Sequence, residues 1–130
     1  MSRGQHVIAG SLAGLLGAAG ALHLVRPAVF EGLIPRGLGS PRAWVYGSGV
    51  AELACAAAVA VPATRRVGGL ASAALFVAVF PGNVKMALDS HPGYRSWARN
   101  PAIAWARLPL QVPLVAWASK VARDAGGREG

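Results

Sequence analysis

A basic residue and an amide stand inside the last apolar stretch of the chain, which runs from 101 to 119. Arg107 and Gln111 are four residues apart, so a helix places them on one face. A guanidinium group inside a bilayer is costly and requires a partner. Glu52, which interrupts another apolar stretch, is the acid at comparable depth. We therefore expect Glu52 to accept hydrogen bonds from Arg107 in a bidentate contact.

Other polar side chains fall at related depths in the remaining apolar stretches. His23 lies near the end of the first stretch, and Asn83 and Lys85 lie near the end of the third. Ionisable groups within membrane spans usually face the interior and pair with one another. We predict a ligand-binding pocket in one half of the bundle, lined by His23, Glu52, Asn83, Lys85, Arg107 and Gln111.

This predicted pocket offers a carboxylate, a guanidinium, amides and an imidazole in apolar surroundings. Such a set suits the carbonyl groups of a quinone-like ring, with Arg107 and Gln111 as donors. Glu52 would orient Arg107 or relay a proton. The alternative is a purely structural pair, in which Glu52 and Arg107 only fix how their two helices pack. The sequence leaves both interpretations open.

Nothing in the sequence is typical of a catalytic site. There is no nucleophile motif, no phosphate-binding loop and no second thiol beside Cys55. Three scattered histidines and one cysteine do not have the spacing of zinc ligands. We expect no catalytic residue and no metal, and the pattern favours a non-enzymatic or accessory role.

The composition is that of a membrane protein. The 130 residues are 54% hydrophobic and 14% charged, which is too apolar for an ordinary soluble domain. The net charge of +8 comes from basic residues spread over short connections, without a patch of interleaved aromatics. We therefore expect the lipid bilayer as the partner of these basic residues, and no nucleic acid.

Four apolar segments each approach the length of helix that crosses a bilayer core. We expect an all-α integral membrane four-helix bundle, with a single domain over 1–122 and a polar tail over 123–130. A short helix after Pro27, at the end of the first span, is predicted to lie at the membrane interface. The predicted spans are about 5–25, 43–61, 67–88 and 101–119.

Local signals mark the ends of the predicted helices. Ser40 and Asn100 each precede a proline, which is the pattern of an N-cap followed by proline at the first helical position. Thr64 is predicted to cap the third span. Pro81 removes a backbone donor near the far end of that span, so we expect an irregular helix there.

The first segment carries small residues at helical spacing between Gly10 and Ala21. This spacing lets helices approach closely in lipid and permits a homo-oligomer. The alternative for the segment is a cleaved signal peptide, because residues 19–21 imitate a small-residue cleavage site. The apolar run is long for a signal core, which favours a retained span.

An even number of spans places both chain ends on one side of the membrane. Lys85 and Arg107 are left out of the charge count because we expect them within the membrane. The side of the termini then has six basic residues against five, which predicts cytoplasmic termini. The six are Arg3, Arg65, Arg66, Lys120, Arg123 and Arg128, and the five are Arg26, Arg36, Arg42, Arg95 and Arg99.

Short motifs are spread over the four segments and their connections. They are Gly20–His23 with Pro27 and Phe30, Gly47–Glu52, Thr64–Arg66, Phe80–Met86, and Arg107–Gln111 with Trp117. Together, over about residues 10 to 120, they resemble the DoxX family of small four-span bacterial membrane proteins. The resemblance implies a plasma-membrane protein without a built-in cofactor, linked to quinones and to complexes that handle thiol and oxidative stress.

The function expected from these features is that of a redox-associated accessory membrane protein whose polar pocket binds a quinone-like ligand. It would act beside a membrane-associated oxidoreductase. One alternative is a structural or scaffolding subunit that recruits a soluble oxidoreductase through its basic loops. The other is a small-molecule permease, which is disfavoured because 130 residues make a narrow bundle unless the chain oligomerises.

Overall fold

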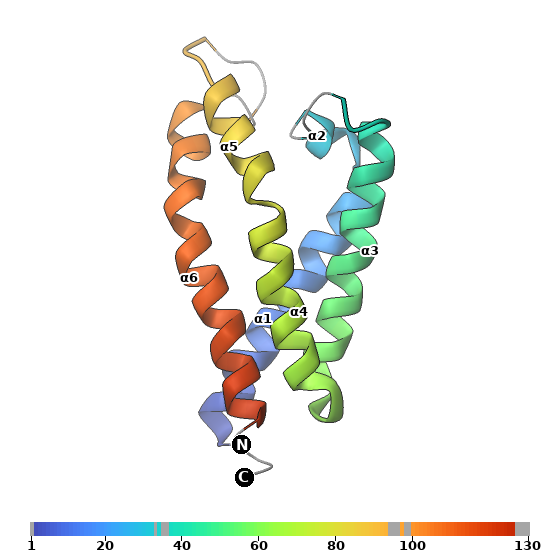
Figure 1. Ribbon diagram of the computed structural model, residues 1–130, viewed down its shortest axis with the longest axis vertical. Helices are drawn as coiled ribbons and strands as arrows, with labels where there is room; N and C mark the ends of the chain where they lie inside the picture. The colour runs from blue at the N-terminus through green and yellow to red at the C-terminus, as the bar shows by residue number, and fades with distance from the viewer. Residues whose placement is uncertain (1, 33, 35–36, 94–96, 98–99, 127–130) are drawn as a thin grey trace.

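The computed structural model describes residues 2–32, 34, 37–93, 97 and 100–126. The regular secondary structure of the described residues is entirely helical and contains no strand. The long helices lie along the long axis of the molecule, and α1 begins where α6 ends, at the same end of the bundle (Figure 1). These helices are α1 (Arg3–Val25), α3 (Pro41–Ala60), α4 (Arg65–Ala78) continued by α5 (Phe80–Asp89), and α6 (Pro101–Gly126).

Two short helices complete the bundle. The helix expected after Pro27 is present as α2 (Ala28–Glu31), and the 3-10 helix η1 (Pro62–Thr64) joins α3 to α4. α6 continues to Gly126, past the predicted end of its span. Some residues named in the sequence analysis lie outside the described residues: Arg36, Arg95, Arg99, Arg128 and the rest of the expected tail at 127–130.

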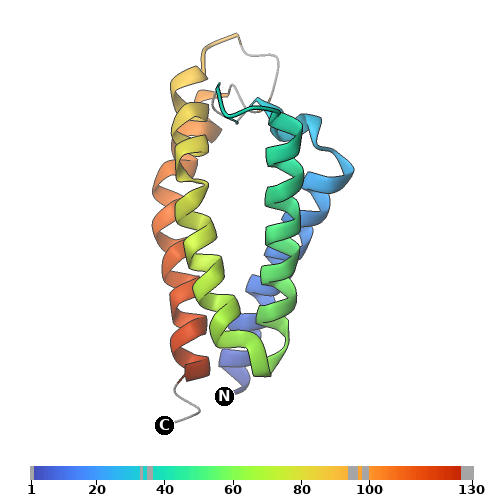
Figure 2. The same cartoon turned by 45° about the vertical axis from the view of Figure 1, so that its right-hand side comes forward.

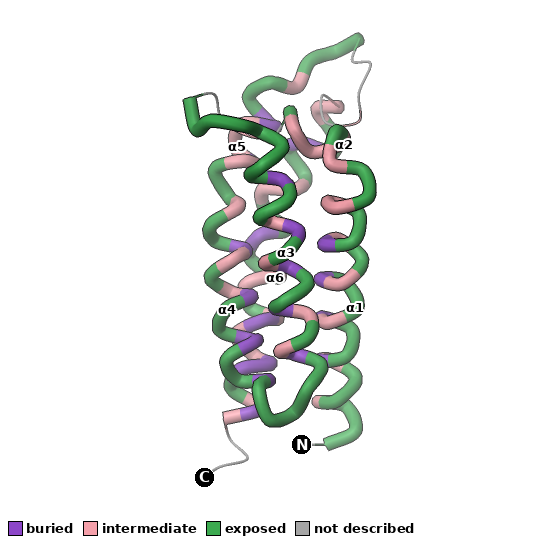
Figure 3. Tube along the Cα trace, turned by 90° about the vertical axis from the view of Figure 1, so that its right-hand side faces the viewer, coloured by how far each residue is buried: buried purple, intermediate pink, exposed green. Residues whose placement is uncertain are grey.

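Within the described part of the chain, three helical segments are long and apolar enough to cross a membrane: Arg3–Val25, Pro41–Ala60 and Pro62–Asp89. α6 is not among them, although the sequence predicts a span over 101–119. Its polar residues, Arg107, Gln111 and Lys120 among them, lower its hydropathy. Exposed positions run along the outer sides of the helices (Figure 3). They include many large apolar residues, such as Val7, Leu22, Val50, Leu70, Val77 and Val112.

Both predicted cap-then-proline boundaries are confirmed. The Ser40 hydroxyl accepts a hydrogen bond from the Ala43 N–H at 3.3 Å, where α3 begins. The Asn100 side-chain oxygen accepts one from the Ala102 N–H at 3.0 Å, where α6 begins. In each case a polar side chain satisfies an N–H that has no partner within the helix.

The turn between α3 and α4 differs from the prediction. Thr64 does not cap α4, because its hydroxyl donates to the Ala58 carbonyl at 2.8 Å. Arg65 is only 5% exposed and donates to the carbonyls of Val59 at 2.6 Å and Ala60 at 2.9 Å. The last carbonyls of a helix lack intrahelical donors, and these two side chains supply them. Arg65 is therefore a buried capping residue and not a lipid anchor.

The third predicted span is divided. α4 ends at Ala78 and α5 begins at Phe80, so the break at Val79 comes two residues before Pro81. The irregularity expected from this proline is present. α4 packs against both α3 and α6, whereas α5 packs mainly against α6, and the cavity described below lies beside the break.

Glycines set the closest helix contacts. A Cβ added at Gly68 would lie 2.6 Å from the Val59 nitrogen on α3, and one at Gly69 would lie 2.8 Å from the Ala122 nitrogen on α6. The expected small-residue face of α1 has no such neighbour at Gly10 or Gly14. Consecutive glycines thus let α4 approach α3 on one side and α6 on the other.

Most of the apolar core fills the half of the bundle where α1 begins. Leu12 and Leu16 of α1 pack there with residues of α3, α4 and α6, and Cys55 is a buried apolar member of this group. A smaller cluster of Met86, Ala87 and Ala104 joins α5 to α6 in the other half. The polar residues of interest lie in that second half.

Candidate functional site

A cavity of about 280 Å³ lies in the half of the bundle that carries α2. Its lining residues come from α1 and α3 on one side and from α4, α5 and α6 on the other. Figure 2 shows how these two groups of helices stand relative to each other. Four of the six predicted site residues line it: His23, Glu52, Asn83 and Arg107. Lys85 and Gln111 do not.

Glu52 is the buried acid of this cavity. The residue is 9% exposed, and its Oε2 atom is buried without a hydrogen-bond partner among the described residues. The Nδ1 atom of His23 lies 3.4 Å from Oε2 but only 2.7 Å from the Ala19 carbonyl. A carbonyl accepts only, so that contact directs an Nδ1 proton to Ala19. Glu52 therefore lines the cavity with a carboxyl group whose buried oxygen has no donor among the described residues.

Arg107 does not form the predicted pair with Glu52. Both residues are described, and neither a hydrogen bond nor an ion pair joins them. The Arg107 guanidinium instead lies over the Trp97 ring, 5.7 Å from its centroid, with Nη1 3.4 Å from the Met86 sulfur. The expected bidentate contact is wrong because α3 and α6 stand on opposite sides of the cavity.

Gln111 has a structural role that the sequence analysis did not anticipate. Its side-chain oxygen accepts a hydrogen bond from the Asn83 amide at 2.9 Å, and its own amide donates to the Phe76 carbonyl in a close contact. Phe76 is in the last turn of α4, where carbonyls lack intrahelical donors. Gln111 thus closes the gap at the helix break, and both polar atoms of its side chain are already engaged by protein partners.

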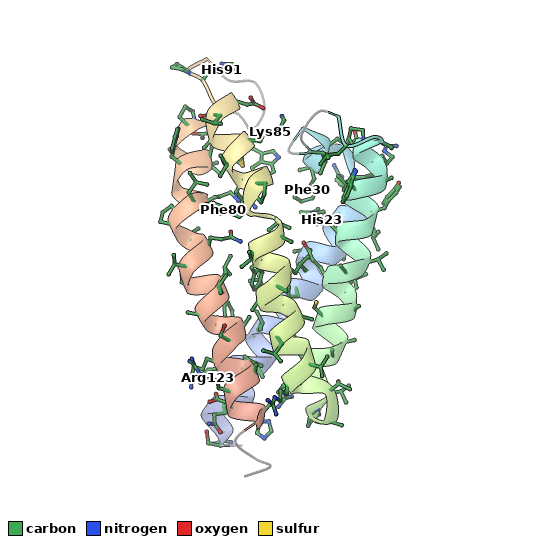
Figure 4. The ribbon with its side chains drawn as sticks, viewed as in Figure 1. His23, Phe30, Phe80, Lys85, His91 and Arg123 are labelled. Carbon is green, nitrogen blue, oxygen red and sulfur yellow. The ribbon has the colours of Figure 1, made fainter. Side chains whose placement is uncertain are left out.

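Lys85 lies at the edge of the bundle, on the side of α5 that faces α2 (Figure 4). Its ammonium group donates to the Gly32 carbonyl at 2.9 Å and pairs with Asp89 at 2.5 Å. Lys85 and Asn83 are two residues apart, and such residues do not share a helix face. A similar position along the bundle was therefore not enough to place both in one pocket.

Lys85→Met is expected to loosen the connection between α5 and α2. The Gly32 carbonyl loses a charged donor, so amide exchange around α2 should rise about fivefold to tenfold. Hydrogen-exchange mass spectrometry of the purified protein in detergent measures this. Lys120→Met is the matched control, since Lys120 also pairs with an acid one turn later, Asp124. Equal exchange around α2 in both variants would contradict the expectation.

His23 and Phe30 line the cavity with stacked rings, and Trp97 packs behind them without lining it. The rings of His23 and Phe30 are stacked, with centroids 3.8 Å apart and planes 6° from parallel (Figure 4). Trp97 meets Phe30 edge to face at 6.2 Å. The short helix α2 thus brings Phe30 over His23, and Trp97 connects that stack to Arg107. Flat aromatic surfaces of this kind accommodate ring-shaped ligands.

Trp44 and Ser48 also line the cavity and were missed in the sequence analysis. Both share a face of α3 with Glu52, because the three residues are spaced by four. This spacing was a usable signal. Gly49 adds a constraint on the same helix, since a Cβ there would lie 2.8 Å from the Cβ of His23. Contact at Gly49 holds the imidazole near Glu52.

Comparison with protein families matches residues 12–122 to a family described as Domain of unknown function (DUF8561). The chain belongs to this family. The DUF8561 match includes every residue that lines the cavity. The resemblance to DoxX is therefore wrong. Its motifs were short runs of glycine, proline and isolated polar residues, and such runs recur in unrelated membrane helices. No curated protein and no solved structure matches the chain.

Proposed function

We propose that this DUF8561 member is a membrane protein whose cavity binds a small uncharged ring with hydrogen-bonding oxygens, of the quinone type. The observation that carries the proposal is the separation of Glu52 from Arg107 across the cavity. Opposite charges in apolar surroundings normally meet or find other polar partners. A ligand that fills the space between them would supply hydrogen bonds to both.

The charges around the cavity favour an uncharged occupant. Formal charges of Glu52 and Arg107 cancel, so a charged ligand would leave one net charge in apolar surroundings. The stack of His23 on Phe30 offers a flat apolar surface to a ring. Arg107 has five N–H donors, which suits a carbonyl or hydroxyl oxygen on that ring.

The proposal includes α6 as a fourth span and a location in the plasma membrane with cytoplasmic ends. Gln111, the amide in the middle of α6, has partners on α4 and α5, which lowers the cost of placing it in lipid. Exposed apolar residues on the same helix, Leu110 and Val112, suit contact with acyl chains. The redox association rested on the DoxX resemblance and is not part of this proposal.

Mass spectrometry of small molecules extracted from the purified protein tests the proposal. We expect a ring compound at near-stoichiometric amount in the wild type and at least about tenfold less in Arg107→Gln, because a charged donor is lost. Arg42→Gln is the matched control, since Arg42 pairs with Glu31 outside the cavity. Circular dichroism reports whether each variant keeps its helices.

Ser48→Leu provides a second variant if Arg107→Gln does not fold. Ser48 lines the cavity from α3, so leucine there fills space without removing a charge. It should also displace the ring compound. The same bulk lipids in the wild type, Ser48→Leu and Arg42→Gln, with no ring compound in any of them, would refute the proposal.

A further inference from the structure

The side chain of Glu52 lines the cavity in which the ring is proposed to bind. We infer that the ligand presents a hydroxyl group to Glu52, so the cavity selects a hydroxylated ring, such as a quinol, over the oxidised ring that has only carbonyls. This inference rests on the proposed function and specifies its ligand. Three observations support it. The Oε2 atom of Glu52 has no hydrogen-bond donor among the described residues, and the Nδ1 proton of His23 is directed to the Ala19 carbonyl. The guanidinium of Arg107 lines the opposite side of the cavity.

The carboxylate oxygen Oε2 of Glu52 has no donor among the described residues, although it is buried. His23 is the nearby candidate donor, but its Nδ1 lies closer to the Ala19 carbonyl, at 2.7 Å against 3.4 Å for Oε2. A buried acceptor without a donor is unfavourable by an amount comparable to a lost hydrogen bond. A ligand that brings its own donor removes this penalty.

The two forms of a quinone ring differ in this respect. Every oxygen of the oxidised ring is a hydrogen-bond acceptor. A ring carbonyl that faces the Glu52 carboxylate would therefore form no hydrogen bond with it, and the two groups would repel each other. A ring hydroxyl donates to the carboxylate, in a charge-assisted bond of the stronger kind. The second ring oxygen can still accept from Arg107 across the cavity. The hydroxylated ring therefore satisfies both sides, whereas the oxidised ring satisfies one.

Calorimetric titration of the detergent-solubilised protein with three rings of one carbon skeleton tests the inference. The probes are duroquinone, its quinol and the dimethyl ether of that quinol, all fully substituted and so unable to add to Cys55. Under anaerobic conditions, we expect the quinol to bind at least about tenfold more tightly than duroquinone or the dimethyl ether. In Glu52→Gln, whose amide both donates and accepts, this ratio should fall to about one.

Glu31→Gln is the control, because it makes the same chemical change outside the cavity and should keep the wild-type ratio. Equal binding of quinol and quinone to the wild type would overturn the inference and leave the proposed function standing. A protonated Glu52 that donates to a carbonyl would give that result. A preference that persists in Glu52→Gln would also overturn it. Binding of none of the probes would overturn the proposed function together with this inference.

Discussion

Gln111→Leu is expected to lower the free energy of unfolding by about 4 kcal/mol, because it leaves two buried polar groups without partners at about 1–3 kcal/mol each. One is the Phe76 carbonyl at the end of α4, and the other is the Asn83 amide on α5. Asn83 and Gln111 are both buried, at 5% and 7% exposed, so water does not replace the lost bonds. Unfolding in mixed micelles with increasing dodecyl sulfate measures the change.

A double-mutant cycle with Asn83→Leu separates the two losses. In the double variant both amides are gone, so neither is left without its partner. The loss of unfolding free energy in the double variant should therefore be clearly smaller than the sum of the losses in the two single variants. The remaining cost then reports the Phe76 carbonyl alone. Additive losses in the cycle would show that the bond between Asn83 and Gln111 does not couple α5 to α6.

Gly68→Ala is the second change with a large expected effect, a loss of about 3 kcal/mol of unfolding free energy from overpacking. The added Cβ would lie 2.6 Å from the Val59 nitrogen and 2.7 Å from the Ala58 carbonyl carbon. These are backbone atoms of α3, so no side-chain rotation relieves the clash, and α4 must move away. The same micelle titration measures this loss.

Gly14→Ala is the matched control for Gly68→Ala. Both changes place alanine within a helix, where it is intrinsically favoured over glycine. A Cβ at Gly14 has no neighbour within 4 Å, so we expect unchanged or slightly raised stability. If Gly68→Ala were as stable as Gly14→Ala, the close approach of α4 to α3 at this point would be wrong.

Helix boundaries were the most predictable part of the fold, because they depend on chemistry within a few residues. The caps at Ser40 and Asn100 and the disturbance near Pro81 are examples, and each follows from local donors and acceptors. Counting residues along each predicted helix also correctly placed His23, Glu52, Asn83 and Arg107 at one cavity. Sequence position is a direct measure of depth when helices run side by side.

The sequence did not predict how each helix is rotated about its own axis, and this rotation decides which neighbour a side chain faces. Gln111 and Lys85 lie at suitable depths, yet one turns to the broken end of α4 and the other to the carbonyl of Gly32. The break at Val79 also changes the course of the chain, so partners across it cannot be found by counting residues. Arg65 was misjudged because a basic residue beside a turn usually anchors at lipid head groups, whereas here it satisfies carbonyls.

Under the proposed membrane location, the turn that joins α3 to α4 has a consequence for insertion into the bilayer. Bonds from Arg65 to Val59 and Ala60, and from Thr64 to Ala58, link residues no more than six apart. They need neither α1 nor α6, so they form as soon as the turn does. This helical hairpin can insert as one unit without offering bare carbonyls to lipid. Docking of α1 then adds the contact of Arg65 with His6 at 3.1 Å.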